Sequence, residues 1–498
     1  MFSDHLFLLL LTPLLALIIA VRTRTKAAAS RRGQNLPPSP YSWPIIGNLP
    51  YMLKGPHIYF TELSRFYGPL CSVKLGTHLF VIGSSPLAAT EIMRAYDRLP
   101  TYRWVPKAGQ DGLQDYSLIW ASECTHHWKL LRSLCRTELF SVKGLDSQSV
   151  LREKNADKMV GFLKTKHGKV VNVRELMFAT TVNILGNICF SNDFVGLEDD
   201  GKDSRGLKRA LYNLMKLGTT PNIADFYPRF EGLDPQGLKK KTSEAMSEAF
   251  SVWEHIIKER RGTWESQKGS GYDEHDFLDT MIRCGFSDLQ INQLTVELFS
   301  GGTHSTASTI EWALAELIKN KESMFAIQNE LAKQIGSTTC IKESHVSRLP
   351  YLHACVKETL RLHPPAPLLH PQAILEGCEI MNYTVPKNSQ MILNVWAMGR
   401  DPSLWEDPLS FKPERFCDSN VDFKGQDFKF LPFGVGRRMC PGYPYAIKQI
   451  HLMLASLVQN FDWFLPDNID LSKLDMTENF GIISQRKKPL MVIPKCKC

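Results

Sequence analysis

The spacing of apolar side chains predicts a largely helical chain. Ala245–Arg261 and Leu289–Asn320 carry apolar residues at three- and four-residue intervals over many turns, which predicts two long helices with apolar faces. Met324–Ile335 and Tyr351–Leu362 show the same spacing over shorter stretches, so shorter helices are expected there. The fold class that follows is mainly α.

Strand signals are few and occur in two places. Val73–Leu75 and Leu79–Ile82 flank Gly76-Thr77, a pattern typical of a β-hairpin. Ile380–Val385 and Gln390–Leu393 are expected to pair as a second hairpin. A small β region therefore accompanies the helical body.

The N-terminus has the pattern of a membrane anchor. Leu6–Val21 is apolar apart from Thr12, and it is followed directly by five basic residues, Arg22, Arg24, Lys26, Arg31 and Arg32. A cleaved secretory signal, which is the alternative, carries its positive charge before the apolar run. Because positive charge after a span holds that end in the cytosol, we expect residues 1–33 to form an anchor helix and a basic stop-transfer segment.

Prolines follow the anchor and give a boundary for the domain beyond it. Leu36–Pro40 holds three prolines and precedes Trp43–Asn48, so residues 34–50 are predicted to be a stiff, extended hinge. Residues 51–498 are then expected to form one catalytic domain despite their length. The polar run Gln267–Asp276 is expected to be one exposed loop.

Charge and cysteine content limit the possible functions. The net charge of the 498 residues is +8; residues 1–33 have five basic and one acidic residue, which leaves +4 for the remainder. The domain is thus only mildly basic, which gives no case for nucleic acid binding. The 12 cysteines lack paired spacing and are expected to stay reduced in the cytosol. Cys496 and Cys498 are interpreted as an exposed tail, since no further zinc ligands are recognisable.

One cysteine near the C-terminus has a setting that suits an iron ligand. Cys440 lies in the segment Phe433-Gly434-Val435-Gly436-Arg437-Arg438-Met439-Cys440-Pro441-Gly442. The glycines permit a tight turn that aims N–H groups at the sulfur, and Arg438 can neutralise a haem propionate. A single cysteine is more often a buried, inert thiol, but the spacing F-x-x-G-x-R-x-C-x-G resembles the cysteine loop of the cytochrome P450 superfamily.

Three upstream motifs extend this resemblance over almost the whole chain. Glu358 and Arg361 match the E-x-x-R helix of the family, and Arg415 in Pro413–Phe416 matches the loop that completes its ion-pair network. Trp128 and Arg132 match the W-x-x-x-R helix, whose indole and guanidinium bind a haem propionate in the family.

The resemblance implies a fold, cofactors and partners. We expect the cytochrome P450 fold, with Cys440 ligating haem b and with Trp128, Arg132, Arg438, Phe433 and Gly434 around it. Oxygen would be the co-substrate, and electrons would come from NADPH through a separate NADPH–cytochrome P450 reductase. The enzyme would be a single-pass protein of the endoplasmic reticulum membrane with a cytosolic domain. Lys429, Arg437 and Lys448 flank the loop and either attract the reductase or are ordinary solvated charges.

The segment Phe299–Thr306 departs from the family pattern. Relatives have [A/G]-G-x-[D/E]-T-[T/S] here, in a helix whose acid and alcohol relay protons to bound oxygen. Gly302 keeps the glycine, but His304 replaces the acid and Ser305 the threonine, with Thr306 after them. His304 is either a proton shuttle or a bystander facing solvent or the backbone.

A second departure is Gln372, where relatives carry an Arg or His that binds a propionate. An uncharged amide implies weaker anchoring. His370, two residues earlier, either compensates or is a polar surface residue.

Four further segments resemble the plant P450 branch that oxidises alkaloids and monoterpenoids: Asp225–Pro228, Leu233–Gly237, Thr309–Leu314 and Phe423–Phe428. The most specific expectation is oxidative rearrangement of a tropane ester, littorine to hyoscyamine aldehyde. Hydroxylation of a terpenoid or another alkaloid, and isomerisation without O₂ or reductase, remain open. So does a catalytically silent haem-binding scaffold.

Overall fold

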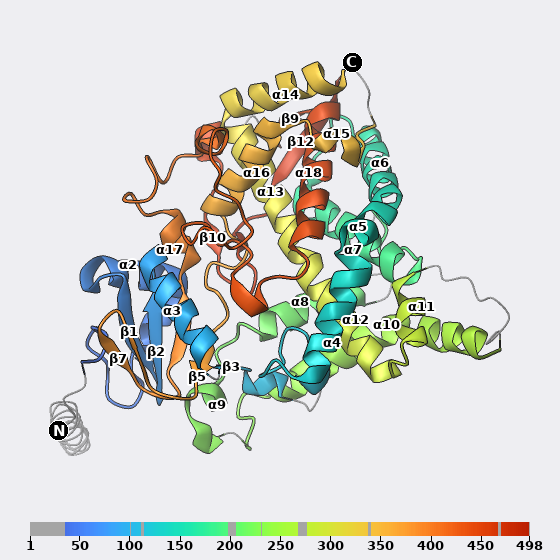
Figure 1. Cartoon of the computed structure of the whole chain (residues 1–498). Helices are drawn as coiled ribbons and strands as arrows, with labels where there is room; N and C mark the ends of the chain where they lie inside the picture. The colour runs from blue at the N-terminus through green and yellow to red at the C-terminus, as the bar shows by residue number, and fades with distance from the viewer. Residues whose placement is uncertain are drawn as a thin grey trace, which may run out of the picture. The chain divides into compact units, whose positions relative to one another are not determined.

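A computed structural model describes residues 35–99, 101–110, 114–197, 206–230, 232–266, 276–336, 340–466 and 470–497 (Figure 1). The predicted anchor, residues 1–33, and positions 267–275 of the predicted exposed loop lie outside these ranges. Within them, no helix combines the length and the apolar character needed to cross a membrane. The chain divides into two compact units.

The first unit comprises residues 35–104, 226–229 and 368–397 and is built on a sheet. The sheet has the order β1-β2-β8-β5-β3, with β1 Leu70–Leu75, β2 His78–Gly83, β3 Thr101–Arg103, β5 Gln372–Ile374 and β8 Gln390–Leu393. Helices α2 (Pro56–Tyr67) and α3 (Pro86–Arg98) and the 3₁₀ helix η1 (Leu49–Lys54) belong to the same unit. The hairpin predicted around Gly76-Thr77 is confirmed, since β1 and β2 pair antiparallel from Leu70↔Gly83 to Leu75↔His78.

The second predicted hairpin is wrong. Strand β8 pairs in parallel with β2 and antiparallel with β5. The actual hairpin joins β6 (Cys378–Ile380) to β7 (Tyr383–Val385). Its turn residues, Met381 and Asn382, have φ angles of 51° and 64°. Two successive residues with positive φ close a two-residue hairpin, so the turn falls inside the segment that we expected to be one strand.

The second unit comprises residues 105–225, 230–367 and 398–498 and is mainly helical. Its helices of five or more residues, in chain order, are α4 (His126–Leu134), α5 (Val142–Ser147), α6 (Ser149–Thr165), α7 (Val173–Phe190), α8 (Leu207–Leu217), α10 (Leu238–Ser266), α11 (Phe277–Arg283), α12 (Asp288–Gly302), α13 (His304–Lys319), α14 (Lys321–Ile335), α16 (Pro350–Leu362) and α18 (Tyr443–Asn460). The short helix α15 (Glu343–Val346) also belongs to this unit, whereas the chain passes from one unit to the other within α9 (Ile223–Phe226) and within α17 (Val395–Gly399). Strands β4 (Val171–Asn172), β12 (Met491–Cys496) and β9 (Phe461–Phe464) form one small sheet, and β10 (Glu478–Asn479) pairs with β11 (Gln485–Arg486).

The core of this unit surrounds α13, α16 and α18, which lie side by side (Figure 1). All but two residues of α13 are buried, so this helix is enclosed nearly all round. A helix that is apolar on every side is expected at the centre of a domain rather than on its surface. The helices that carry the candidate site are therefore fixed by core packing.

Three of the four predicted helices are confirmed in position. Ala245–Arg261 lies within α10, Met324–Ile335 within α14, and Tyr351–Leu362 within α16. The predicted helix Leu289–Asn320 is instead two helices, α12 and α13, which are interrupted at Thr303. Thr303 has φ −94° and ψ −65°, and its hydroxyl donates to the carbonyl of Phe299 at 2.7 Å. A threonine hydroxyl that bonds back to the preceding turn is known to bend helices.

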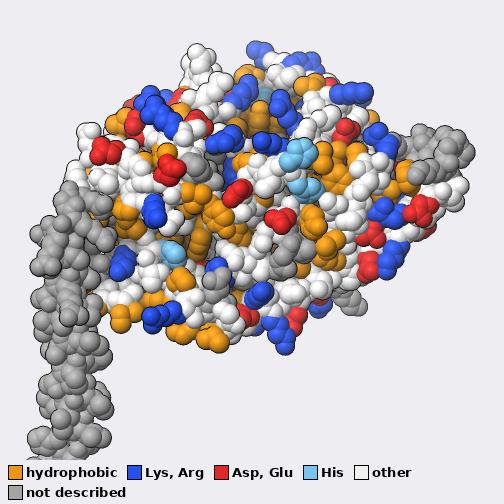
Figure 2. Space-filling view, turned by 60° about the horizontal axis from the view of Figure 1, so that its bottom comes forward, with side chains coloured by type: hydrophobic (Ala, Val, Ile, Leu, Met, Phe, Trp, Pro, Cys, Tyr) orange, Lys and Arg blue, Asp and Glu red, His pale blue; other side chains and the backbone are white. Residues whose placement is uncertain are grey.

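Charges of both signs are interspersed on the face shown in Figure 2. The 11 cysteines in the described part of the chain are free thiols.

Candidate functional site

The segment before α18 forms a tight loop around Cys440. The Cys440 amide donates to the carbonyl of Phe433 at 2.9 Å, and the Gly434 amide donates to the carbonyl of Leu431 at 3.1 Å. Gly434 and Gly436 have φ angles of 73° and 74°. Because side-chain-bearing residues rarely adopt this conformation, the two glycines are required for the loop to close as it does.

The environment of the Cys440 sulfur contains opposing influences on its pKa. Although the side chain keeps accessible surface, protein atoms surround the sulfur, and this burial raises the pKa of the Cys440 thiol. The backbone N–H groups of Gly442 and Tyr443 point at the sulfur and lower the pKa, as does the positive charge of Arg132. These groups stabilise a thiolate, which is the form that binds a metal.

Two arginines share one indole ring beside this loop. The guanidinium carbons of Arg132 and Arg438 lie 5.4 and 5.3 Å from the centre of the Trp128 ring. Arg132 donates to the carbonyl of Met439 at 2.7 Å, and Arg438 donates to the carbonyl of Ser122 at 3.0 Å. Burial lowers the pKa of both guanidinium groups.

These residues fit a haem propionate. Among the described residues neither Arg132 nor Arg438 has a carboxylate partner, and the buried Nη1 of Arg438 makes no hydrogen bond. Two neighbouring positive charges and an unused donor form a site for an anionic group, beside a cysteine whose sulfur accepts N–H groups. The donor set therefore suits a haem whose iron binds Cys440 and whose propionate meets the two arginines.

Trp128 has a partner that sequence reasoning did not predict. Its indole N–H donates to the carbonyl of Leu118 at 2.9 Å. A propionate contact by this N–H stays a prediction. Sequence reasoning also missed Ser122 and Cys124, which contact Arg438. The sequence around Ser122 and Cys124 does not indicate these contacts, because a backbone carbonyl and a single thiol produce no recognisable motif.

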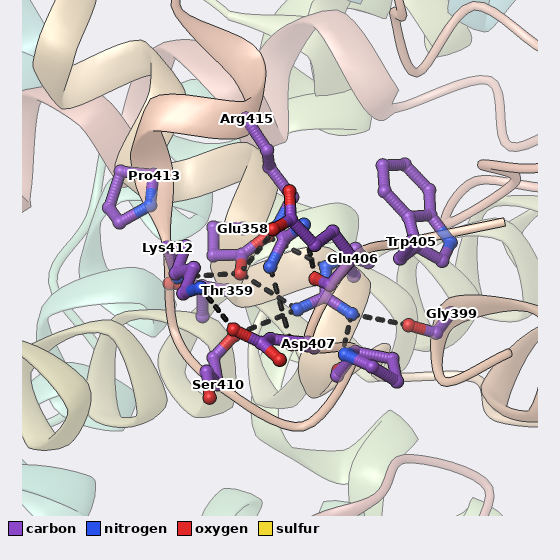
Figure 3. A network of polar contacts seen from close by, with 12 residues as sticks. Glu358, Thr359, Gly399, Trp405, Glu406, Asp407, Ser410, Lys412, Pro413 and Arg415 are labelled. Atoms are coloured by element: carbon purple, nitrogen blue, oxygen red, sulfur yellow. Dashed lines mark hydrogen bonds and ion pairs between the residues drawn. The ribbon is translucent and has the colours of Figure 1, made fainter. Parts of the chain in front are cut away.

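The E-x-x-R motif forms a buried charge network on α16 (Figure 3). Arg361 binds Glu358 through Nε and Nη2, at 2.7 Å each, and the pair is fully buried. Arg415 donates to the same carboxylate at 3.0 Å, as predicted from its loop, and the Lys412 amide adds a bond at 2.8 Å. Arg361 also donates to the carbonyls of Gly399, Pro408 and Ser410. The network thus binds α16 to residues 399–415.

The interruption between α12 and α13 exposes one face of the segment that carries the altered motif. Gly301 is exposed and Ser305, one turn later, is partly exposed. The Ser305 hydroxyl donates to the Gly301 carbonyl at 2.6 Å. A Cβ on Gly302 would lie 2.9 Å from Leu185 of α7, so a larger residue would require that side chain to shift. Thr306 is buried, and its hydroxyl makes no hydrogen bond to any of the residues that the structure describes.

His304, the residue before Ser305, is buried. Its ring packs against Phe178 of α7 at 4.7 Å between centres, and Nδ1 lies 3.3 Å from the Thr303 hydroxyl. Burial, with a smaller effect of Arg174, lowers the pKa of His304 to about 4. The ring is therefore neutral near pH 7, which does not support the first of the two alternatives for His304, a proton shuttle at that pH.

This pKa leads to a prediction for stability. The unfolded imidazole binds a proton below pH ~6.5, whereas the folded one does so only near pH 4. The free energy of unfolding should therefore decrease as the pH is lowered between these two values. We expect a loss of about 2 kcal/mol between pH 7 and pH 5, and His304→Leu should remove this component. Urea unfolding at both pH values measures it. The control is His255→Leu, an exposed position on α10, which should keep the wild-type pH dependence.

The remaining predicted residues lie as follows. Lys448 pairs with Glu343 at 3.2 Å and Asp146 at 3.5 Å, so it is engaged within the protein. The Lys429 ammonium lies 5.3 Å from the centre of the Trp405 ring. Gln372 belongs to the first unit, where it stands opposite Arg103 in the pairing of β5 with β3, and His370 contacts the Trp104 carbonyl at 3.0 Å. Weaker anchoring by Gln372 stays a prediction.

Comparison with known proteins agrees with the geometry of the cysteine loop. The sequence model of the family described as "Cytochrome P450" matches residues 37–493. The chain belongs to the cytochrome P450 family. This P450 is therefore an oxidoreductase of the monooxygenase class, and the family implies haem-thiolate iron, O₂ and electrons from a reductase.

Three relatives share most of their length with this P450. It is 47% identical to a probable (S)-N-methylcoclaurine 3'-hydroxylase isozyme 2 of Coptis japonica, over 94% of each chain. It is 42% identical to corytuberine synthase of Coptis japonica, over 93% of this chain and 95% of the relative. It is 39% identical to berbamunine synthase of Berberis stolonifera, over 93% of this chain and 94% of the relative.

Proposed function

We propose that this P450 oxidises a plant alkaloid. The observation that carries the proposal is its identity of 39–47% to enzymes named for alkaloid oxidation, over more than nine-tenths of each chain. The intact Cys440 loop and the buried Glu358–Arg361 pair support a working oxidase over a silent scaffold.

The described residues would have separate roles in such an oxidation. Haem, when bound through Cys440, supplies iron that activates O₂, and electron donation from a thiolate favours cleavage of the O–O bond. Arg132 and Arg438 would neutralise a haem propionate and so orient the cofactor. The network around Glu358 holds α16 against residues 399–415. Ser305 holds a proton at Oγ on the accessible face of the α12–α13 interruption, next to the Gly301 carbonyl.

A second candidate is the oxidative rearrangement of a tropane ester, littorine to hyoscyamine aldehyde. The altered motif favours this candidate, because position 304 offers no carboxylate and its neutral imidazole packs against Phe178. The same departure from the family pattern also supports a further alternative, an isomerisation that needs neither O₂ nor the reductase.

We also propose that residues 1–33 anchor the enzyme in the endoplasmic reticulum membrane, with its catalytic domain in the cytosol. The basic cluster directly after Leu6–Val21 supports this orientation. NADPH–cytochrome P450 reductase, which is held by the same membrane, would supply the electrons. The enzyme should therefore be assayed in microsomes that contain this reductase.

The test is turnover of N-methylcoclaurine, other benzylisoquinolines, littorine and a monoterpenoid, followed by mass spectrometry. We expect NADPH-dependent conversion of an alkaloid, with gain of one oxygen atom for hydroxylation or loss of two hydrogens for rearrangement to the aldehyde. Ser305→Ala should lower product per NADPH and raise hydrogen peroxide by about 10-fold or more, whereas Ser305→Thr should not. Conversion of the monoterpenoid alone would contradict the proposal, and turnover without NADPH would establish the isomerase.

A further inference from the structure

Glu297 is a buried carboxylate that none of the roles above uses. It lies on α12, 5% exposed, and it accepts hydrogen bonds from the Leu118 amide at 2.7 Å and the Ile119 amide at 3.1 Å. The Ser117 hydroxyl also donates to it, and Gln293, one turn earlier on α12, donates from Nε2 at 3.0 Å. Burial raises the pKa of Glu297, and these four donors oppose that effect. A carboxylate is stable at such a depth only when its oxygens are satisfied in this way.

The segment that Glu297 holds is a tight turn of residues 117–120. The Ser117 hydroxyl accepts the Trp120 amide at 2.5 Å, which closes the turn upon itself. Its first three residues all donate to Glu297, so one carboxylate of α12 holds three residues of the turn.

Leu118 of this turn meets the candidate haem site. The carbonyl of Leu118 accepts a hydrogen bond from the indole N–H of Trp128. The guanidinium groups of Arg132 and Arg438 lie over the ring of the same tryptophan. The amide and the carbonyl of Leu118 therefore connect Glu297 to Trp128 through a single residue. A displacement of the turn would change the hydrogen bond that orients the indole.

The next residue of the turn, Ile119, meets the accessible face of the α12–α13 interruption. The Cδ1 atom of Ile119 lies 3.9 Å from the point that a Cβ on Gly301 would occupy. Gly301 is the residue whose carbonyl accepts the Ser305 hydroxyl. The Ile119 side chain thus bounds this face next to the proposed proton donor.

We propose that Glu297 is a positioning residue: through the turn 117–120 it sets the Trp128 indole at the haem edge and the Ile119 side chain over Gly301. The placement of Ile119 rests on the proposed function, because the location of this side chain determines how a substrate can lie against the accessible face at Gly301. Glu297 itself is bonded to the turn and to Gln293. Its effect on the products comes through the turn alone.

The test compares Glu297→Gln with a matched buried carboxylate. Gln keeps the size of the side chain but turns an NH₂ group toward backbone N–H donors. The control is Glu311→Gln on α13; Glu311 is also fully buried and accepts an amide, from Leu490 at 2.8 Å, but it pairs with Arg174 and does not bind the turn. Both variants should lower the unfolding midpoint.

Two readouts separate positioning from stability. Glu297→Gln should raise the rate of haem transfer to apomyoglobin about five- to tenfold, because it misaligns the hydrogen bond from the Trp128 indole to the Leu118 carbonyl. Trp128→Phe, which removes this bond, should have an effect of the same size. It should also shift the product ratio in the direction that Ile119→Ala shifts it. Glu311→Gln should change neither. If Glu297→Gln lowers only the unfolding midpoint, Glu297 is a structural residue and the proposal is wrong.

Ser117→Ala provides the same test with a milder change. It removes one donor from Glu297 and the acceptor of the Trp120 amide but keeps the carboxylate, so it should raise haem loss about two- to threefold even if Glu297→Gln fails to fold. Wild-type haem loss in Ser117→Ala would overturn the proposal in that case. Haem transfer needs no substrate, so its outcome is independent of whether the alkaloid assignment is correct.

Discussion

Replacing Cys440 with serine should abolish monooxygenase activity and the absorption band at ~450 nm that the reduced, carbon monoxide-bound enzyme gives with a thiolate ligand. The hydroxyl of serine can accept the same N–H groups from Gly442 and Tyr443, so the loop should keep its conformation. It cannot supply a soft anionic ligand at neutral pH. We expect turnover to fall by at least ~1,000-fold with a nearly unchanged circular dichroism spectrum.

The matched control for this change is Cys124→Ser. Cys124 also lies beside an arginine, Arg438, but it is outside the glycine-bounded loop. Its variant should keep the band at ~450 nm. Retention of that band by Cys440→Ser would show that another cysteine binds the iron. Cys135 is a poor substitute, since burial raises its pKa to about 12 and keeps it a neutral thiol.

Motifs whose function depends on fixed local spacing could be predicted from the sequence. Glu358 and Arg361 lie three residues apart on one helix, so their ion pair follows from helical geometry. Arg415 could be placed with them only through resemblance to the family, because it reaches Glu358 across 57 residues. The hairpin of β1 and β2 was predictable for the same reason as the ion pair, because its two strands adjoin one short turn.

Long-range pairing and burial explain what could not be predicted. Strand β8 was placed with its sequence neighbour, but it pairs with β2, which lies more than 300 residues earlier. The burial of His304 depends on Phe178 of another helix, so its low pKa has no signal in the motif itself. Glu297 is similar: its spacing fits an ordinary helix, and only the fold brings the turn of residues 117–120 to it.

Removing the carboxylate of Glu358 should be among the most destabilising single changes in the network of Figure 3. In Glu358→Ala, Arg361 and Arg415 would each lose an ion pair, and Arg361 would remain fully buried with an uncompensated charge. Breaking a buried pair on one side costs about 3–5 kcal/mol, much more than the pair contributes relative to apolar groups. A loss of this size approaches the total stability of many domains, so little haem-loaded protein should accumulate.

Two companion variants identify the cause of that loss. Glu414→Gln changes an exposed carboxylate in the same loop, where it accepts the Tyr351 hydroxyl at 2.6 Å, and it should cost no more than about 1 kcal/mol. Arg361→Leu should be at least as harmful as Glu358→Ala, because it also leaves the carbonyls of Gly399, Pro408 and Ser410 without this donor. Urea unfolding and the carbon monoxide difference spectrum measure stability and haem content separately. Wild-type stability in Glu358→Ala would mean that packing, and not charge, holds α16 to residues 399–415.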